Sequence, residues 1–311
     1  MTAPPNYPPD LLPGVVSNVA DGVARVIAPN PSIMTGPGTN TYAIGDGAVV
    51  LIDPGPDDDV HHDRLLELYG DRLRALLVTH SHLDHSPLAS RLAAATGAPV
   101  IGFGPPPRFV TDRLSATTGD WHHLDGHDQT FSPDRRMSDG DQLDCGDFRI
   151  EAVWTPGHTS NHLCFELVGT GLLFSGDHVM SGSTVVIAPP DGDMSDYFGS
   201  LEKVRARAPR RIGPGHGAMI DDPASVLDGY LRHRTERERQ VEAGVAAAGS
   251  DGISVEALVK MIYIDVPEVL HPVARYSVWA HLRKLGVEGR ANCVEPDDIS
   301  AIWNQPVATA F

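Results

Sequence analysis

The sequence predicts an α/β layered domain followed by a small helical or winged-helix module. Through the first 220 residues, short apolar runs alternate with helical patterns and with turns rich in Gly and Pro, the rhythm of strands and helices packed in layers. From Pro223 onward, helical patterns and a short tail follow. With 311 residues, 41% of them hydrophobic, the chain is long enough for one large core and a smaller one. We divide it into a 1–19 N-terminal extension, a 20–222 α/β domain, and a 223–311 segment that holds a linker helix and the small module.

The α/β domain opens with strands and helices in alternation. Ala48–Asp53 is a continuous apolar run that ends at Pro54-Gly55-Pro56, as a buried strand does. Spacing and stop signals then predict a helix over 63–69, a strand over 73–79, a helix over 88–95 and a strand over 99–103.

Residues 104–137 interrupt this order. They are rich in Pro, Asp and His and have no period, so we predict a loop insertion, in which Phe109 and Trp121 are candidates for covering a substrate. Beyond it, strands are predicted over 148–154, 162–167 and 172–175.

The C-terminal part reads as helices. Charges of both signs alternate from Arg232 to Arg239, which predicts a solvent-exposed helix face or a linker. Helical spacing returns over 253–264 and 272–285, and Gly286 ends the second pattern.

Composition argues against several classes of protein. No apolar run approaches the length of a membrane span, and the first residues lack the features of a secretory signal. Three widely spaced cysteines do not suggest a disulfide framework, so we expect a cytoplasmic protein. The net charge of −17, from 24 basic and 41 acidic residues, does not suit duplex DNA as a partner. Solubility explains most of this excess, and some of the acids are expected to face bound cations.

The segment Thr79-His80-Ser81-His82-Leu83-Asp84-His85 carries the strongest chemical signal. It lies between a predicted strand and a predicted helix. Alternation along an extended backbone sends His80 and His82 the same way, and the entry into the helix turns Asp84 and His85 toward a neighbouring point. Imidazoles and carboxylates so concentrated predict metal ligands, and one turn can serve two adjacent cations.

With three later motifs, this segment resembles the metallo-β-lactamase superfamily over about residues 20–222. Thr155-Pro156-Gly157-His158-Thr159, Ser175-Gly176-Asp177 and Pro214-Gly215-His216-Gly217 are similar to that family's later motifs. The resemblance implies an αββα sandwich with metals at one edge. It implies that one metal is bound by His80, His82 and His158, that a second is bound by Asp84, His85 and His216, and that Asp177 bridges both. It also implies that Asp53 supports the site.

Mixed imidazole and carboxylate ligands favour two Zn²⁺ ions, although Mn²⁺ or Fe²⁺ accept the same set. We expect a hydroxide held between the metals to be the nucleophile, with Asp84 orienting it and accepting its proton. His178 and His162 are candidates for a supporting donor or an oxyanion stabiliser, with packing as the other reading. The pairs His61-His62 and His122-His123, with His127, are not predicted to hold a third metal, because nothing constrains their geometry.

The expected substrate is an ester, thioester, lactone or β-lactam-type amide. The alternative is endonucleolytic cleavage of single-stranded RNA, because the SGDH segment at 175–178 and the C-terminal helices resemble the mitochondrial β-lactamase-like endoribonucleases and their bacterial relatives. The arginines at 205, 207, 210 and 211 either grip a phosphate backbone or form a solvated helix end. Asn40-Thr41-Tyr42 is interpreted as opening the first sheet. A regulatory protein with a vestigial site is disfavoured by the complete ligand set, and the sequence leaves room for a homodimer.

Overall fold

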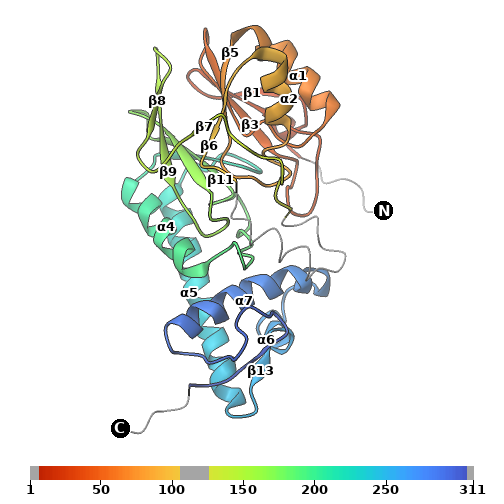
Figure 1. The fold of residues 1–311 in the computed structure, drawn as a ribbon, viewed down its shortest axis with the longest axis vertical. Helices are drawn as coiled ribbons and strands as arrows, with labels where there is room; N and C mark the ends of the chain where they lie inside the picture. Colours follow the sequence, from red (N-terminus) through yellow and green to blue (C-terminus); the bar gives the residue numbers. More distant parts are fainter. Residues whose placement is uncertain (1–6, 106–125, 307–311) are drawn as a thin grey trace. The chain divides into compact units, whose positions relative to one another are not determined.

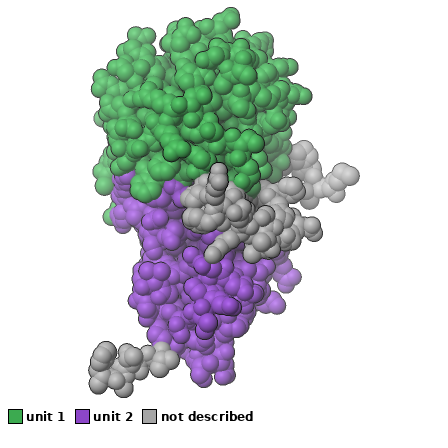
Figure 2. Space-filling view, viewed as in Figure 1, with its two compact units in different colours: residues 1–155, 161–185, 204–224 green, residues 156–160, 186–203, 225–311 purple. Residues whose placement is uncertain are grey.

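A computed structural model describes residues 7–105 and 126–306. The chain forms two compact units (Figure 2). The first comprises residues 1–155, 161–185 and 204–224, and the second comprises residues 156–160, 186–203 and 225–311.

The first unit contains two sheets. Within the described residues, the first sheet has seven strands in the order β1-β2-β3-β4-β5-β6-β7. Neighbours are antiparallel from β1 to β4 and parallel from β4 to β7. The strands are β1 (Val16–Ala20), β2 (Val23–Ile27), β3 (Asn40–Ile44), β4 (Val49–Ile52), β5 (Leu73–Leu77), β6 (Val100–Gly102) and β7 (Arg135–Arg136).

The second sheet has five strands, again counted over the described part of the chain, in the order β12-β11-β10-β9-β8. They are β8 (Gln142–Asp144), β9 (Arg149–Trp154), β10 (Leu163–Leu167), β11 (Leu172–Gly176) and β12 (Arg211–Pro214). The pair β11–β12 is parallel, and Gly176 lies opposite Pro214. The loops that follow these two strands therefore leave the sheet side by side.

Alternation along β5 divides the apolar side chains between two cores. Ala75 and Leu77 belong to the core between the two sheets. Leu76 faces the other way, where it packs with residues of α1 (Asp59–Tyr69) and α2 (Leu88–Thr96), the helices beside β5 in Figure 1. This arrangement is the predicted layered α/β sandwich, with helices outside two facing sheets.

Local signals end the helices where the sequence indicates. Asp58 caps α1 by accepting a hydrogen bond from the amide of His61 at 2.8 Å. Gly97 closes α2 in the left-handed region, at φ 76°, where glycine is least strained. Among the residues that the structure describes, three short 3₁₀ turns, η1 (Pro9–Leu11), η2 (Gly70–Arg72) and η3 (Glu268–Leu270), accompany the main elements.

The second unit contains most of α4 (Met194–Arg207) and the C-terminal elements α5 (Pro223–Ala248), β13 (Ile253–Ser254), α6 (Val255–Ile262), α7 (His271–Val287) and β14 (Ile302–Trp303). Strand β13 pairs with β14. The helices enclose a small apolar core that includes the fully buried Trp303. The predicted helical module is thus a set of helices with one short two-stranded sheet.

Three expectations need correction. The first sheet begins at Val16, inside the predicted 1–19 extension, because an edge strand with exposed positions gives a weak apolar signal. Ile253 begins a strand rather than a helix. Its strand partner Trp303 lies 50 positions away, so a local sequence pattern does not reveal the pairing. The charged stretch of α5 is only partly exposed, because Arg234 and Glu238 are buried at 2% and 8% exposure.

The 104–137 insertion ends in β7, which extends the first sheet next to β6. Most of the insertion, including Phe109, Trp121, His122 and His123, lies outside the described residues. None of the helices within 7–105 and 126–306 has the length and apolar character needed to cross a membrane.

Candidate metal centre

Four of the predicted ligands meet in one group. His216 Nε2 lies 3.2 Å from Asp84 Oδ2 and 3.4 Å from Asp177 Oδ1. His85 Nε2 lies 3.5 Å from the same Asp177 oxygen and 3.3 Å from His216 Nε2. These atoms come from the β5–α2 turn and from the loops after β11 and β12.

The remaining ligands form an adjoining group. His80 Nε2 lies 2.9 Å from His82 Nδ1, and His80, His82 and His158 offer ligand atoms within 4.8 Å of one another. His80 also groups with His85 and Asp177. The structure thus brings all seven predicted ligands into linked groups, an arrangement consistent with a binuclear site.

The donor atoms suit zinc in chemistry and spacing. Zinc binds imidazole nitrogen at about 2.0–2.1 Å, so neighbouring atoms of a tetrahedral shell lie about 3.3 Å apart. The separations among Asp84, His85, Asp177 and His216 run from 3.2 to 3.6 Å. Mixed nitrogen and oxygen donors are also accepted by other first-row divalent metals, so the spacing supports a metal pair without identifying the element.

Two loop histidines are oriented by backbone carbonyls. His158 Nδ1 donates to Val186 O at 2.8 Å, and His216 Nδ1 donates to Gly38 O at 3.3 Å. A carbonyl oxygen only accepts, so each contact places the ring proton on Nδ1 and leaves Nε2 as the ligand atom.

Asp53 supports the turn that carries the HxHxDH motif, as expected. Its carboxylate accepts hydrogen bonds from the amide of Thr79 at 2.7 Å, the hydroxyl of Thr79 at 2.8 Å and His85 Nδ1 at 2.9 Å. The Thr79 hydroxyl in turn accepts from His80 Nδ1 at 3.0 Å. One carboxylate therefore sets the ring orientation of a ligand in each group. Asp53 itself has a φ of 51°, a strained conformation outside glycine.

The group of Asp84, His85, Asp177 and His216 favours positive charge. Burial alone lowers the pKa of His216, but the Asp177 and Asp84 carboxylates outweigh it and raise that pKa to about 9. Burial likewise opposes charge on His85, and the same carboxylates raise its pKa well above the usual value. Burial favours the neutral form of Asp177, yet the imidazoles of His216 and His85 hold its pKa well below the ordinary range. The carboxylates therefore stay ionised and attract cations.

His162 supports Asp177, the carboxylate predicted to bridge the metals. The amide of Asp177 donates to His162 Nε2 at 3.2 Å, while His162 Nδ1 contacts the hydroxyl of Thr155 at 2.9 Å. Gly176, at φ 47°, allows this close approach, because a Cβ there would lie 2.8 Å from His162 Nε2. His162 is thus placed to fix the loop that presents Asp177.

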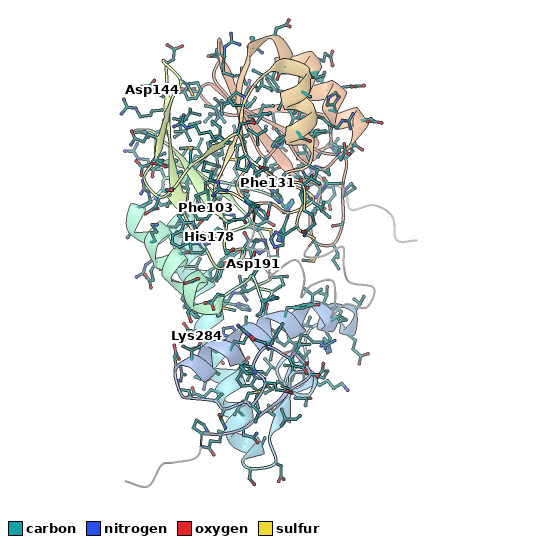
Figure 3. All side chains as sticks on the ribbon, in the orientation of Figure 1. Phe103, Phe131, Asp144, His178, Asp191 and Lys284 are labelled. Carbon is teal, nitrogen blue, oxygen red and sulfur yellow. The ribbon has the colours of Figure 1, made fainter. Side chains whose placement is uncertain are left out.

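His178, labelled in Figure 3, directly follows Asp177 and is fully buried, with its ring 6.2 Å from that of His162. Full burial leaves no surface for direct substrate contact, so any effect on the reaction would pass through a neighbouring group. Its role as a supporting donor or oxyanion stabiliser stays a prediction.

Sequence reasoning missed a clamp on the turn that carries His216. Asn40 Nδ2 donates to Pro214 O at 2.9 Å and to Gly217 O at 3.0 Å. The Tyr42 hydroxyl also donates to Pro214 O at 2.9 Å. The prediction that Asn40-Thr41-Tyr42 opens the first sheet was therefore wrong, since the segment begins the third strand of that sheet, β3, and also anchors a predicted ligand.

The clamp extends to a buried arginine. Arg25, 1% exposed, donates to Gly217 O at 3.2 Å and to the carboxylate of Asp10 at 3.0 Å. A buried guanidinium needs such partners, so the N-terminal 3₁₀ turn η1 contributes to the neighbourhood of His216.

His127 was not predicted to bind a metal, and its place beside the predicted ligand His82 was missed, because the insertion around it has no period. Its ring lies 4.8 Å from that of His82, and its Nδ1 contacts the hydroxyl of Ser81 at 2.9 Å. A Gly-His-Asp sequence at 126–128 was the available signal.

Two arginines of the basic run are held by ion pairs. Arg207 contacts Glu151 at 2.5 Å and Glu166 at 2.7 Å, both on the second sheet. Arg211 contacts Asp221 at 2.7 Å. These side chains already have acidic partners, which weakens the reading of the run as a phosphate grip.

Comparisons with known proteins agree with this geometry. Residues 34–216 match a family model described as the metallo-beta-lactamase superfamily, and residues 254–303 match a beta-lactamase associated winged helix domain. A beta-lactamase-like protein 2 homolog from Drosophila melanogaster is 32% identical over 308 residues, covering 96% of this chain and 99% of the relative. An atrochrysone carboxyl ACP thioesterase from Aspergillus fumigatus is 30% identical over 223 residues, covering 70% of this chain and 63% of the relative.

A comparison with solved structures supports the fold. The crystal structure of a beta-lactamase domain protein from Burkholderia ambifaria matches with a TM-score of 0.76 at 20% identity, covering 94% of this chain and 95% of that one. The family match spans more than half of the sequence, and the His/Asp cluster lies at the loops where the motifs predict it. This chain therefore belongs to the metallo-beta-lactamase superfamily, as a hydrolase with an αββα sandwich and a C-terminal winged-helix domain.

Proposed function

We propose that the protein binds two Zn²⁺ ions and hydrolyses an acyl substrate, with esters and thioesters foremost and lactones or β-lactam-type amides in the same class. The observation that carries this proposal is the linked His/Asp cluster with Asp84 at its accessible side. The Asp84 side chain is 30% exposed, against 12% for Asp177 and 6% for His216. Similarity to a thioesterase supports a carbonyl substrate.

The chemistry that a zinc pair supplies when bound is a water of lowered pKa and polarisation of the substrate oxygen. Asp84 would accept the proton of the attacking water as the bond from water oxygen to carbonyl carbon forms. The bond from carbonyl carbon to the leaving oxygen, sulfur or nitrogen then breaks, and the proton passes from Asp84 to the leaving group. Asp53 and His162 would keep the reacting side chains in place.

Cleavage of single-stranded RNA is the alternative, and the winged-helix match favours it together with the resemblance to the β-lactamase-like endoribonucleases. Two observations oppose it. The net charge is −17, and Arg207 and Arg211 are paired with acidic residues. Phosphate-backbone binding depends on unpaired basic groups.

A parallel assay of purified protein tests the proposal with a chromogenic β-lactam, a lactone, a thioester and a labelled single-stranded RNA. We expect hydrolysis of an acyl substrate that stops after chelation and returns with zinc. The rate should change little as salt rises from about 50 to about 200 mM, whereas RNA cleavage should fall steeply.

Asp84→Asn supplies the matched variant, and we expect it to lower acyl hydrolysis by about 100-fold or more. Salt-sensitive RNA cleavage without acyl hydrolysis would overturn the proposal in favour of the alternative. Acyl hydrolysis that survives complete metal removal would overturn the metal-dependent mechanism.

A further inference from the structure

We propose that Tyr197 and Arg234 are positioning residues for His158, so that the winged-helix module takes part in holding a metal ligand. The proposal rests on His158 as a ligand and on contacts inside the second compact unit. It does not depend on which substrate is hydrolysed.

The loop at 156–160 belongs to the same compact unit as the winged-helix module. Its backbone is fastened to the start of α4 by two hydrogen bonds. The hydroxyl of Ser200 donates to Pro156 O at 2.7 Å, and the amide of Asp193 donates to Gly157 O at 2.9 Å. Because both bonds reach backbone carbonyls, a displacement of α4 would move the loop directly.

Gly157 brings the loop against α4 more closely than any other residue type would allow. Its φ is 132°, and a Cβ at this position would overlap the backbone of Tyr197. The next residue, His158, is 7% exposed and is oriented by Val186 O. The loop therefore rests on the backbone of α4 at Tyr197, one residue before the ligand.

The side chain of Tyr197 packs against α5, the linker helix that precedes the winged-helix module. It is fully buried, and the guanidinium carbon of Arg234 on α5 lies 5.3 Å from the centre of its ring. Arg234 is itself only 2% exposed. A cation is attracted more strongly to an aromatic face in a desolvated place than in water, so this contact joins α4 to α5.

A second aromatic side chain repeats the contact. The ring of Phe198 lies 5.4 Å from Lys284 Nζ and 6.5 Å from the ring of His281, both on α7. Lys284 is labelled on this helix in Figure 3. Adjacent residues of α4 thus contact the linker helix α5 and the helix α7 of the winged-helix module.

Glu238 fixes α5 to α7 at the same level. Its carboxylate, about 10% exposed, lies 2.9 Å from Lys284 Nζ, 3.0 Å from Arg290 Nη1 and 3.4 Å from His281 Nδ1. Glu238 follows Arg234 by four residues, so both lie on one face of α5. The helices that contact Tyr197 and Phe198 are consequently joined by a charged network centred on the buried Glu238 carboxylate, which is costly to leave without partners.

The sequence of contacts runs from the buried network of α5 and α7, through the aromatic residues of α4, to the loop that presents His158. The steps through Tyr197 and Arg234 join buried side chains, and those through Phe198 and Lys284 join half-buried ones. Loosening the module should therefore increase the motion of the 156–160 loop and weaken metal binding.

The experiment compares Arg234→Met with Arg239→Gln in the full-length protein. Arg239 lies on the same helix, but its side chain is 71% exposed and pairs with Glu236. We expect Arg234→Met to speed amide hydrogen exchange in the 156–160 loop and to weaken zinc binding about 10- to 100-fold, as loss of a ligand's support does. Arg239→Gln should leave both unchanged.

Arg234→Lys is the milder second variant, because it retains the charge and loses the planar guanidinium. If Arg234→Met folds, the exchange rate and zinc affinity of Arg234→Lys should lie between those of wild type and Arg234→Met. If Arg234→Met does not fold, Arg234→Lys should still fold, with faster loop exchange and weaker zinc binding than wild type. Unchanged loop exchange and wild-type zinc affinity in the folded variants, with faster exchange confined to α5 and α7, would overturn the proposal. Neither readout requires a substrate, so failure here is distinct from failure of the acyl-hydrolase proposal.

Discussion

The loops that carry His216 and His158 are held in different ways. Side chains from two strands of the first sheet, Arg25 on β2 and Asn40 on β3, grip the carbonyls around His216. The loop of His158 is held by groups at the start of α4. The first ligand depends on strand register, and the second depends on helix packing. The two ligand loops are therefore held by separate sets of contacts, and different substitutions should disturb each set independently.

The largest effect is expected for a residue that both groups share. Asp177→Ala removes the predicted bridging carboxylate, so we expect one metal per chain to be lost and turnover to fall on the order of 1000-fold, about 4 kcal/mol in activation free energy. Metal analysis and kcat on the hydrolysed substrate measure these effects, with circular dichroism to confirm the fold. Two metals retained per chain would show that the bridging assignment is wrong.

Asn40→Ala should disturb the His216 side alone. It removes one of two donors from the carbonyls of Pro214 and Gly217, which keep Tyr42 and Arg25 as donors, so the free energy of unfolding should fall by about 0.5–1.5 kcal/mol. Affinity for one of the two zinc ions should fall about 10- to 100-fold, while amide exchange in the 156–160 loop stays unchanged. Asn18→Ala, at an exposed position of β1, is the matched control. Faster exchange in that loop would contradict the separation of the two supports.

His61 makes the stability of the contacts around Asp53 depend on pH. It contacts the hydroxyl of Thr41 at 2.9 Å, and that hydroxyl donates to the backbone oxygen of Asp53 at 2.7 Å. Burial lowers the pKa of His61 to about 4, from 6.5 in an unfolded chain. Between these values the unfolded chain binds a proton that the folded chain does not, so stability falls as pH falls.

Because of this histidine, the free energy of unfolding should fall by about 2 kcal/mol when the pH is lowered from 7 to 5. We expect His61→Gln to reduce the pH dependence of denaturant unfolding by that amount. Wild type and variant are compared after chelation, so that metal binding does not contribute. An equal slope in both proteins would show that His61 does not titrate in this way.

The parts of the molecule that local sequence patterns describe were predicted well. Buried strands such as β4 and β5 are short apolar runs, and the ligand motifs place their side chains at strand ends. The clamp on His216 could not be predicted in this way, because Asn40 and Pro214 are 174 positions apart. Its acceptors are backbone carbonyls, which every residue has, so the type of residue does not indicate them. The burial of Arg234 and Glu238 was missed for a related reason, since a charged residue indicates solvent unless its distant partners are known.

The parallel pairing of β11 with β12 has a consequence for how precisely this enzyme must pair its strands. Asp177 and His216 follow paired strand ends, with Gly176 opposite Pro214 and the amide of Gly215 bonded to Gly176 O at 2.8 Å. A slip of one residue in this pairing would turn the side chains of β12 to the opposite face of the sheet and carry the turn of His216 away from Asp177. An apolar strand can pair in either register, so the contacts that fix this register matter more for the metal centre than the apolar character of the strand.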